Sequence, residues 1–145
     1  MILPYKPYQL DTLMDLWLES TISGHPFIAE SYWHDSRSVV RDVYIPHSET
    51  WVYMQEEKMI GFISIIDRQF IGALFVASSH TGNGVGGQLL KHVQSRFPAL
   101  SLEVYQKNQR AVHFYHHMGF RLEEAAWQTD TQHPTWIMCW KNQEK

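Results

Sequence analysis

Residues 82–87 are the part of the sequence whose composition most clearly indicates binding chemistry. This segment contains four glycines and stands directly before apolar residues at helical spacing. Glycines at the start of a helix expose backbone N–H groups and the positive end of the helix, which together bind a phosphate group without a side-chain charge. We therefore predict that a diphosphate-bearing cofactor contacts the amides of Asn83, Gly84, Val85, Gly86 and Gly87.

The same segment also matches the dinucleotide-binding pattern G-x-G-x-x-G, with Glu103 about 20 residues further on. In that pattern the first glycine directly follows a strand, whereas residues 77–81 separate Val76 from Gly82. A doubly wound fold would also begin with this unit, but most of the first half of the chain precedes it. A dinucleotide-dependent oxidoreductase is therefore the minor alternative, and glycines that only allow a tight turn into the helix are another.

Tyr115 is the first candidate for proton transfer. In a helix over 108–118, Asn108, Ala111 and Tyr115 lie on one face, because they are three and four residues apart. A phenol with a pKa near about 10 stays protonated at neutral pH and can share its proton with a departing thiolate, whose pKa is about 8.5. Asn108 is either the helix cap or a cofactor contact, Ala111 permits close approach, and Tyr115 could instead be a core aromatic beside Phe114.

Helices and strands are both needed to position these residues. Apolar spacing predicts a helix over 10–23 and a second, mainly helical stretch over 27–44. The segment 70–76 is nearly continuously apolar, and we expect it to be a central strand buried on both faces. With the glycine segment, a helix over 84–97 and a strand over 100–105, it forms a βαβ unit of parallel strands. β-branched and aromatic runs predict the remaining strands over 51–54, 59–66, 120–128 and 135–140.

The predicted fold class is α/β, a single domain over residues 1–145 with a mixed, mostly antiparallel central sheet, one parallel βαβ joint and flanking helices. The chain has 145 residues, 44% of them hydrophobic, which suffices for one core. The net charge of -3 argues against nucleic acid and anionic membrane as partners. A single cysteine, no signal peptide and no membrane-length apolar run favour a cytoplasmic protein. We predict no metal site, because His113 and His117 have no carboxylate or cysteine beside them.

Two motifs resemble those of the GNAT family of N-acetyltransferases. Residues 81–86 follow a strand and are similar to the acetyl-CoA loop of the family, which is Arg or Gln, two residues, Gly, any residue, then Gly or Ala. Residues 108–120 resemble its second motif, N-x-x-A-x-x-F-Y-x-x-x-G-F, and the order of elements is similar over the whole chain. The chain departs from the pattern at Thr81, where Arg or Gln is common, and at Ser78, where proline is frequent.

The resemblance implies an enzyme that transfers the acetyl group of acetyl-CoA, its co-substrate, to a primary amine by direct attack on the thioester. It implies backbone contacts to the pantetheine from Leu74, Phe75 and Val76, whose side chains would fill the core, and a general-acid role for Tyr115. Because Thr81 lacks the usual side chain, we expect the loop amides to hold the diphosphate. A CoA-binding sensor without turnover is the alternative.

The base that deprotonates the amine has two candidates, because an alkyl ammonium with a pKa near about 10.4 is not a nucleophile. Segment 102–104 resembles the branch of the family that acetylates the N-terminus of a ribosomal protein, which implies that Glu103 acts through water. An ordinary exposed strand glutamate would look the same. His25 and Phe27 lie where the acceptor enters in the family and are candidate acceptor contacts. His25 is also the rival base, unless it only makes a structural hydrogen bond.

The acceptor amine is indicated by resemblance alone. Segments 23–28 and 134–138 are similar to the small bacterial YiaC and YjaB type, which implies lysine side chains of proteins. The other resemblance implies a protein α-amine, and small polyamines or aminoglycosides stay open. The acidic net charge favours a cationic acceptor. We expect a monomer or a homodimer.

Overall fold

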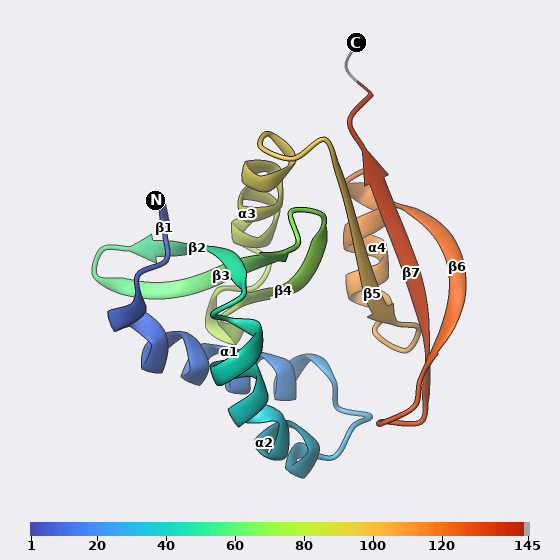
Figure 1. The fold of residues 1–145 in the computed structure, drawn as a ribbon, viewed down its shortest axis with the longest axis horizontal. Helices are drawn as coiled ribbons and strands as arrows, with labels where there is room; N and C mark the ends of the chain where they lie inside the picture. The colour runs from blue at the N-terminus through green and yellow to red at the C-terminus, as the bar shows by residue number, and fades with distance from the viewer. Residues whose placement is uncertain (144–145) are drawn as a thin grey trace.

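The computed structural model describes residues 1–143, and its elements follow the predicted order (Figure 1). The helices are α1 (Leu10–Gly24), α2 (Glu30–Val39), α3 (Val85–Gln94) and α4 (Gln109–His117). The strands are β1 (Ile2–Pro4), β2 (Ser48–Gln55), β3 (Lys58–Ile66), β4 (Phe70–Val76), β5 (Ala99–Tyr105), β6 (Arg121–Gln128) and β7 (His133–Lys141). Short 3-10 turns, η1 (Pro7–Gln9) and η3 (Ser78–His80), precede α1 and follow β4, and a π-helical turn, η2 (Val40–Tyr44), extends α2.

Several element boundaries differ from the prediction, and one strand was not predicted. The second helix begins at Glu30, because residues 25–29 form a loop rather than its first turn. Helix α3 ends at Gln94, and Phe97 is buried beyond its end although it fitted the helical spacing. Strand β1 was not predicted, because a three-residue strand that ends in proline carries almost no pattern.

The strands form one seven-stranded sheet in the order β1-β2-β3-β4-β5-β7-β6. Every neighbouring pair is antiparallel except β4 and β5, which run parallel. The predicted mixed sheet with one parallel βαβ joint is therefore confirmed, with α3 as the connecting helix. Strand β4 is the fourth of the seven and hence central, as predicted.

The parallel joint is very short. Strands β4 and β5 are paired only at Phe70 and Ser101, where the Ser101 amide also donates to the Gln69 carbonyl at 2.8 Å. Beyond this point the strands separate, as the green and ochre arrows of Figure 1 show. The carboxyl-terminal half of β4 therefore presents an edge without a backbone partner on the β5 side. This gap positions the site described below.

Two hydrophobic clusters lie on the two faces of the sheet. Helices α3 and α4 cover one, which includes Leu89, Leu90 and Phe120, and α1 covers the other, which includes Leu13 and Trp17. The strand buried on both faces is β3, where residues 59–65 are all buried. The prediction of that role for β4 is wrong, because only Ile71 of β4 is fully buried. The rest of β4 is partly exposed, since its second half borders the gap.

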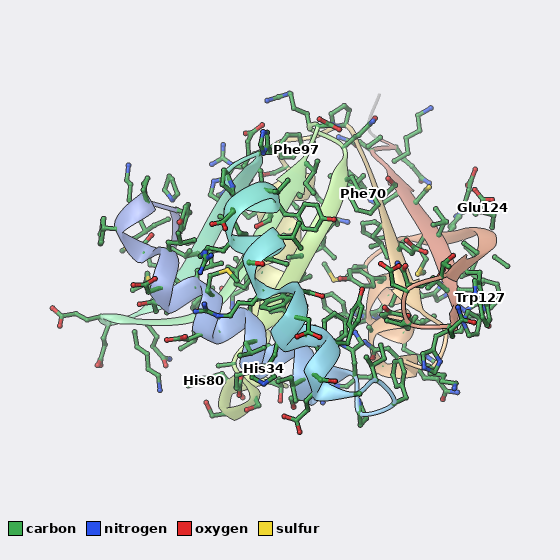
Figure 2. All side chains as sticks on the ribbon, turned by 60° about the horizontal axis from the view of Figure 1, so that its bottom comes forward. His34, Phe70, His80, Phe97, Glu124 and Trp127 are labelled. Carbon is green, nitrogen blue, oxygen red and sulfur yellow. The ribbon has the colours of Figure 1, made fainter. Side chains whose placement is uncertain are left out.

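The edge strand β6 is exposed along most of its length. Leu122 and Trp127 are 53% and 55% exposed, and Figure 2 shows Glu124 and Trp127 at the outer side of the molecule. None of the helices within residues 1–143 is long and apolar enough to span a bilayer.

Candidate active site

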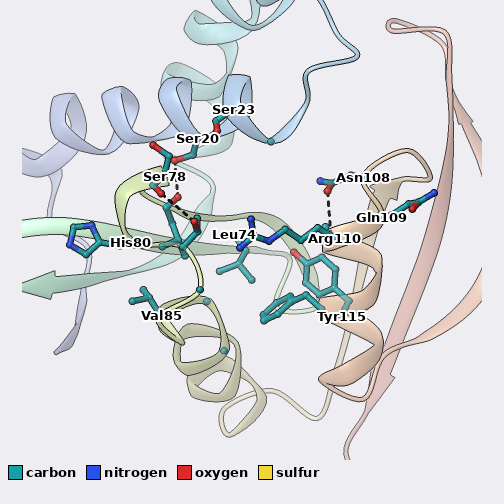
Figure 3. A pocket seen from close by; sticks show the side chains of 18 of the residues that line it. Ser20, Ser23, Leu74, Ser78, His80, Val85, Asn108, Gln109, Arg110 and Tyr115 are labelled. Carbon is teal, nitrogen blue, oxygen red and sulfur yellow. Dashed lines mark hydrogen bonds between the residues drawn. The ribbon is translucent and has the colours of Figure 1, made fainter.

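A cavity of about 770 Å³ lies along the second half of β4, where β4 and β5 have separated, and its lining includes Leu74 and Val76 but no residue of β5. Helix α1 and the loop after it border one side, and the starts of α3 and α4 border the others (Figure 3). Most of the predicted site residues meet here. Those that line the cavity are Phe27, Leu74, Val76, Gly84, Val85, Gly86, Gly87, Asn108, Ala111 and Tyr115.

The start of α3 offers backbone donors to this cavity. Gly82 and Gly84 have φ of +86° and +83°, a left-handed conformation that glycine adopts without steric cost. Gly84 is the N-cap, and the first amide to return to it is that of Gln88, at 3.0 Å from the Gly84 carbonyl oxygen. The amides that precede Gln88 in α3 therefore have no acceptor within the helix and can bind an anion. Asn83 does not line the cavity, and its cofactor contact stays a prediction.

Strand β4 supplies the second wall through its free edge. The amide of Ala77 donates to the Ile60 carbonyl of β3 at 2.8 Å. Because successive residues of a strand direct their N–H and C=O groups to opposite sides, the backbones of Val76 and Leu74 face the gap. The side chains of Leu74 and Val76 pack against the hydrophobic core, as predicted, and both residues also line the cavity. Phe75 does pack in the core, with its ring 5.9 Å from that of Phe62.

The hydroxyl of Tyr115 points into the cavity from α4 (Figure 3). Its ring packs against Phe114 and Phe120, with centroids 5.2 and 5.6 Å away, and no hydrogen bond of its hydroxyl is seen within residues 1–143. Burial raises the pKa of Tyr115 well above that of an ordinary phenol. The expectation of an ordinary pKa is therefore wrong, and a free phenolate is disfavoured. A proton given by Tyr115 must be replaced as the reaction ends.

Asn108 has a structural role that can be observed directly. Its side-chain oxygen accepts a hydrogen bond from the Ala111 amide at 3.3 Å, which is the geometry of a helix N-cap. The predicted cap is confirmed. Asn108 also lines the cavity, and its cofactor contact stays a prediction. Gly119, with φ of +96°, ends this helix in the predicted left-handed conformation.

Cationic side chains at the rim of the cavity were not predicted. Lys107 and Arg110 both line it, and Arg110 extends across it toward Leu74 in Figure 3. In the part of the chain that the structure describes, Lys107 and Arg110 form no ion pair. They can therefore offer their charge to an anionic ligand, in place of the side chain missing at Thr81. Arg110 could have been found from the sequence, because it lies within the 108–120 motif.

The loop after α1 is held by an aromatic cluster formed by His25, Phe27, Tyr105 and His133. The His25 ring lies 5.8 Å from Phe27 and 5.3 Å from Tyr105, and Phe27 lies 5.2 Å from His133. This cluster connects the loop to the end of β5 and the start of β7. Phe27 reaches the cavity, whereas His25 does not line it.

The hydrogen bonds of His25 fix its tautomer. Its Nδ1 lies 2.7 Å from the Thr21 carbonyl oxygen. Because a carbonyl only accepts, Nδ1 carries the proton and Nε2 is the free acceptor. Burial lowers the pKa of His25, and the bond to Thr21 opposes this only in part. The predicted alternative to a role as base, a structural hydrogen bond of His25, is present as the bond to Thr21.

Glu103 lies on β5, opposite the diverging half of β4, and its side chain is exposed. The Thr135 hydroxyl donates to its carboxylate at 2.6 Å, which fixes its orientation. Glu103 does not line the cavity. It shares a face of β5 with Tyr105, two residues further on, and so lies on the side that the aromatic cluster covers. Within residues 1–143 no group of three or more His, Cys, Asp or Glu side chains could hold a metal ion.

Comparison with known proteins connects this geometry to a family. Residues 10–120 match the acetyltransferase (GNAT) family. The chain is 46% identical over 140 residues to the peptidyl-lysine N-acetyltransferase YiaC of Escherichia coli, with 97% of this chain and 96% of the relative covered.

Two solved structures share the fold. The solution structure of apo YjaB from Escherichia coli superimposes with a TM-score of 0.83 at 26% identity, covering 97% of this chain and 96% of the other. The PaiA N-acetyltransferase of Thermoplasma acidophilum, crystallised with coenzyme A, gives a TM-score of 0.81 at 20% identity and 98% coverage of both chains.

The cavity, the free amides at the start of α3 and the match over residues 10–120 together indicate one class of enzyme. The chain belongs to the acetyltransferase (GNAT) family. It is an N-acetyltransferase that uses acetyl-CoA as its co-substrate and an amine as acceptor.

Proposed function

We propose that this enzyme acetylates lysine side chains of proteins, with Tyr115 as general acid. The observation that carries the proposal is the continuity of the cavity, which connects the amides at the start of α3, the free edge of β4 and the Tyr115 hydroxyl. This order fits a coenzyme A molecule with its diphosphate at the α3 amides, its pantetheine arm along the free edge of β4 and its sulfur near the Tyr115 hydroxyl. Lys107 and Arg110 add positive charge at the rim.

Acetyl-CoA supplies a thioester whose carbonyl carbon is the electrophile. The neutral amine of the acceptor attacks this carbon, so that a C–N bond forms and the C–S bond breaks. A backbone N–H on the free edge of β4 polarises the carbonyl oxygen. The Tyr115 hydroxyl gives its proton to the departing sulfur. It recovers a proton from the positively charged nitrogen of the tetrahedral intermediate as that nitrogen becomes the neutral amide, directly or through water.

We assign the removal of the amine proton to Glu103, acting through water. Glu103 lies on β5, the strand that borders the gap, and its carboxylate is held by Thr135 of the next strand, β7. His25 is the weaker candidate, because its Nδ1 is occupied by the Thr21 carbonyl and its ring is enclosed by Phe27 and Tyr105. In this assignment His25 shapes the loop and Phe27 contacts the acceptor.

The acceptor side of the site suits a cation. Burial raises the pKa of Tyr105, and the negative charges of Glu103 and Asp130 raise it further. Their field therefore reaches the aromatic cluster beside which the acceptor would enter, and it favours a lysine ammonium. YiaC and YjaB, which resemble this chain, are both named peptidyl-lysine N-acetyltransferases.

We also propose that the enzyme acts in the cytoplasm, as a monomer or homodimer, and that its acceptor is protein rather than nucleic acid.

The test is release of coenzyme A thiol from acetyl-CoA with a matched panel of acceptors. The panel contains a lysine peptide with a blocked N-terminus, the same peptide with arginine for lysine and a free N-terminus, a polyamine, an aminoglycoside and no acceptor. We expect turnover with the first peptide and a 42 Da mass increase located on the lysine side chain, the mass of one acetyl group in place of hydrogen. Turnover confined to the second peptide would reassign the acceptor to an α-amine, and binding of acetyl-CoA without release from any acceptor would support a sensor.

The base is tested by the pH dependence of kcat/KM in two variants. Glu103→Gln should lose the ascending limb of the profile, because the amide cannot accept the proton. His25→Ala should lower activity through loop disorder but keep the ascending limb. Loss of the limb in the histidine variant alone would reverse the assignment.

A further inference from the structure

A set of polar contacts joins the last turns of α1 to the segment that follows β4. The Ser20 hydroxyl, on a residue only 7% exposed, lies 3.2 Å from the Val76 carbonyl oxygen and 3.0 Å from the Glu19 carboxylate. The Glu19 carboxylate also accepts from the Ser78 amide, at 3.3 Å, and from the Ser78 hydroxyl. Figure 3 shows Ser20 and Ser78 facing each other across this junction. Two adjacent residues of α1 thus hold this junction: Ser20 contacts Val76 at the end of β4, and Glu19 contacts Ser78.

The segment 78–84 has little else to hold it. Six of its seven residues are exposed, no member belongs to either hydrophobic cluster, and Gly82 and Gly84 add conformational freedom. Its internal hydrogen bonds, such as that of the His80 amide to the Ala77 carbonyl, join near neighbours only. Ser78 and Glu19 are 59 residues apart in sequence, and the hydrogen bonds between them connect the segment to the body of the protein.

We propose that Glu19 is a positioning residue for acetyl-CoA, which fixes the segment leading to the phosphate-binding amides of α3. The proposal rests on the proposed acetyl-CoA site. A loop held in its bound conformation loses less entropy on binding, so the co-substrate binds more tightly. Because Glu19 is distant from the reacting atoms, its effect falls on KM for acetyl-CoA and on the Kd of coenzyme A, and kcat is preserved.

The backbone around Ser78 explains why a carboxylate is needed here. Ala77 has φ of −52° and ψ of 136°, the conformation required of a residue before proline, and Ser78 is the first residue of a helical turn, where proline is favoured. A proline at position 78 would therefore restrict this junction through its ring. In this chain Ser78 lacks that restriction, and the two hydrogen bonds to Glu19 take its place.

The negative charge of Glu19 gives the proposal a sharp discriminator. A carboxylate beside an anionic co-substrate opposes binding by repulsion, whereas its hydrogen bonds to Ser78 promote binding by ordering the loop. Glu19→Gln removes the charge but keeps an oxygen that can accept from Ser78, and Glu19→Ala removes both. Asp15→Ala is the matched control, since Asp15 carries the same charge one turn earlier on α1 and its only ion pair within the described residues is a 3.8 Å contact with Arg37.

The experiment measures coenzyme A binding by calorimetry and steady-state kinetics with saturating acceptor. Loss of the charge-assisted bonds in Glu19→Ala should raise Kd and KM about tenfold, with kcat within about twofold of wild type. Glu19→Gln and Asp15→Ala should bind within about threefold of wild type. A wild-type Kd in Glu19→Ala, or a fall in kcat with KM unchanged, overturns the proposal.

A second variant separates loop order from general damage to the fold. Ser78→Pro in the Glu19→Ala background should recover most of the lost affinity, because the proline ring restores the restriction. Hydrogen exchange of the amides of residues 79–84 in the protein without ligand should be faster in Glu19→Ala and slower again in the double variant. Failure of the proline to restore either property refutes the mechanism. If wild type binds no coenzyme A, the proposed function itself fails, whereas wild-type binding with unchanged Glu19→Ala affinity refutes only the role of Glu19.

Discussion

Replacing Tyr115 with phenylalanine removes one hydroxyl group and leaves its packing in place. The ring contacts with Phe114 and Phe120, at 5.2 and 5.6 Å between centroids, involve no oxygen. Since the hydroxyl has no hydrogen-bond partner within residues 1–143, its loss should change the free energy of unfolding by no more than about 0.5 kcal/mol. Any larger effect on the reaction must therefore come from proton transfer.

The expected loss of rate follows from the role assigned to the phenol. A positioned general acid contributes about 10²–10⁴ to the rate, which corresponds to about 3–5 kcal/mol of transition-state stabilisation. We expect kcat for Tyr115→Phe to fall at least about a hundredfold, while KM for acetyl-CoA stays within about threefold. Because burial raises the pKa of Tyr115, the phenol stays protonated across the neutral range, and kcat of the wild type should not decline below about pH 10.

The assay is thiol release at saturating acetyl-CoA and acceptor, together with urea unfolding of each variant. Tyr53→Phe is the control, because its hydroxyl lies outside the cavity and donates to Gln88 at 3.2 Å. It should retain wild-type kcat. If Tyr115→Phe retains kcat within about threefold, Tyr115 is a packing residue and the assignment of the proton donor is refuted.

Three further predictions concern the elements around the site. Gly84→Ala places a side chain at φ of +83°, which should cost about 1–2 kcal/mol and weaken coenzyme A binding, whereas Gly84→Asn should cost less; equal Kd values in calorimetry would contradict this. Asn108→Ala removes the α4 cap and should lower the free energy of unfolding by about 1 kcal/mol, with Asn108→Asp restoring it; thermal melts of the three proteins decide. For His25, whose pKa burial lowers, the unfolded chain binds a proton below about pH 6.5 that the folded chain excludes, so stability falls as pH falls from that value toward the folded pKa. His25→Phe should lose this pH-dependent part of the free energy of unfolding, which urea unfolding at pH 7.5 and 5.5 measures. If both proteins lose the same free energy of unfolding between these pH values, His25 does not contribute.

Some elements could be predicted from the sequence because their signals are local. The apolar run 70–76 has the bounds of β4, and Asn108 and Gly119 delimit α4 through capping and left-handed geometry that depend only on neighbouring residues. The glycines at 82 and 84 likewise follow from backbone sterics. Local chemistry thus accounts for the backbone geometry at the start of α3, where we propose that the diphosphate binds.

Burial and long-range contacts were less predictable. An apolar strand next to a gap has the same sequence pattern as one in a closed sheet, which is why β4 was expected to be buried and β3 carries that role instead. Glu19 had no signal of its own, because its partner Ser78 is 59 residues away. The departure from proline at position 78 was visible, but only the fold shows what compensates for it. His25 illustrates the same limit, since its ring packs against Trp33 of α2 and Tyr105 of β5, and Tyr105 is 80 residues away in sequence.

The single rung of backbone pairing between β4 and β5 makes the two parts of the sheet mechanically weak along their common seam. In the proposed complex, a pantetheine chain along the free edge of β4 bonds to backbone groups that a continuous ladder would have paired, so acetyl-CoA is part of the architecture as well as a reactant. Under this proposal, opening of the seam competes with binding of the ligand, and occupancy slows local unfolding. We therefore expect bound acetyl-CoA to lengthen the survival of this enzyme in limited proteolysis.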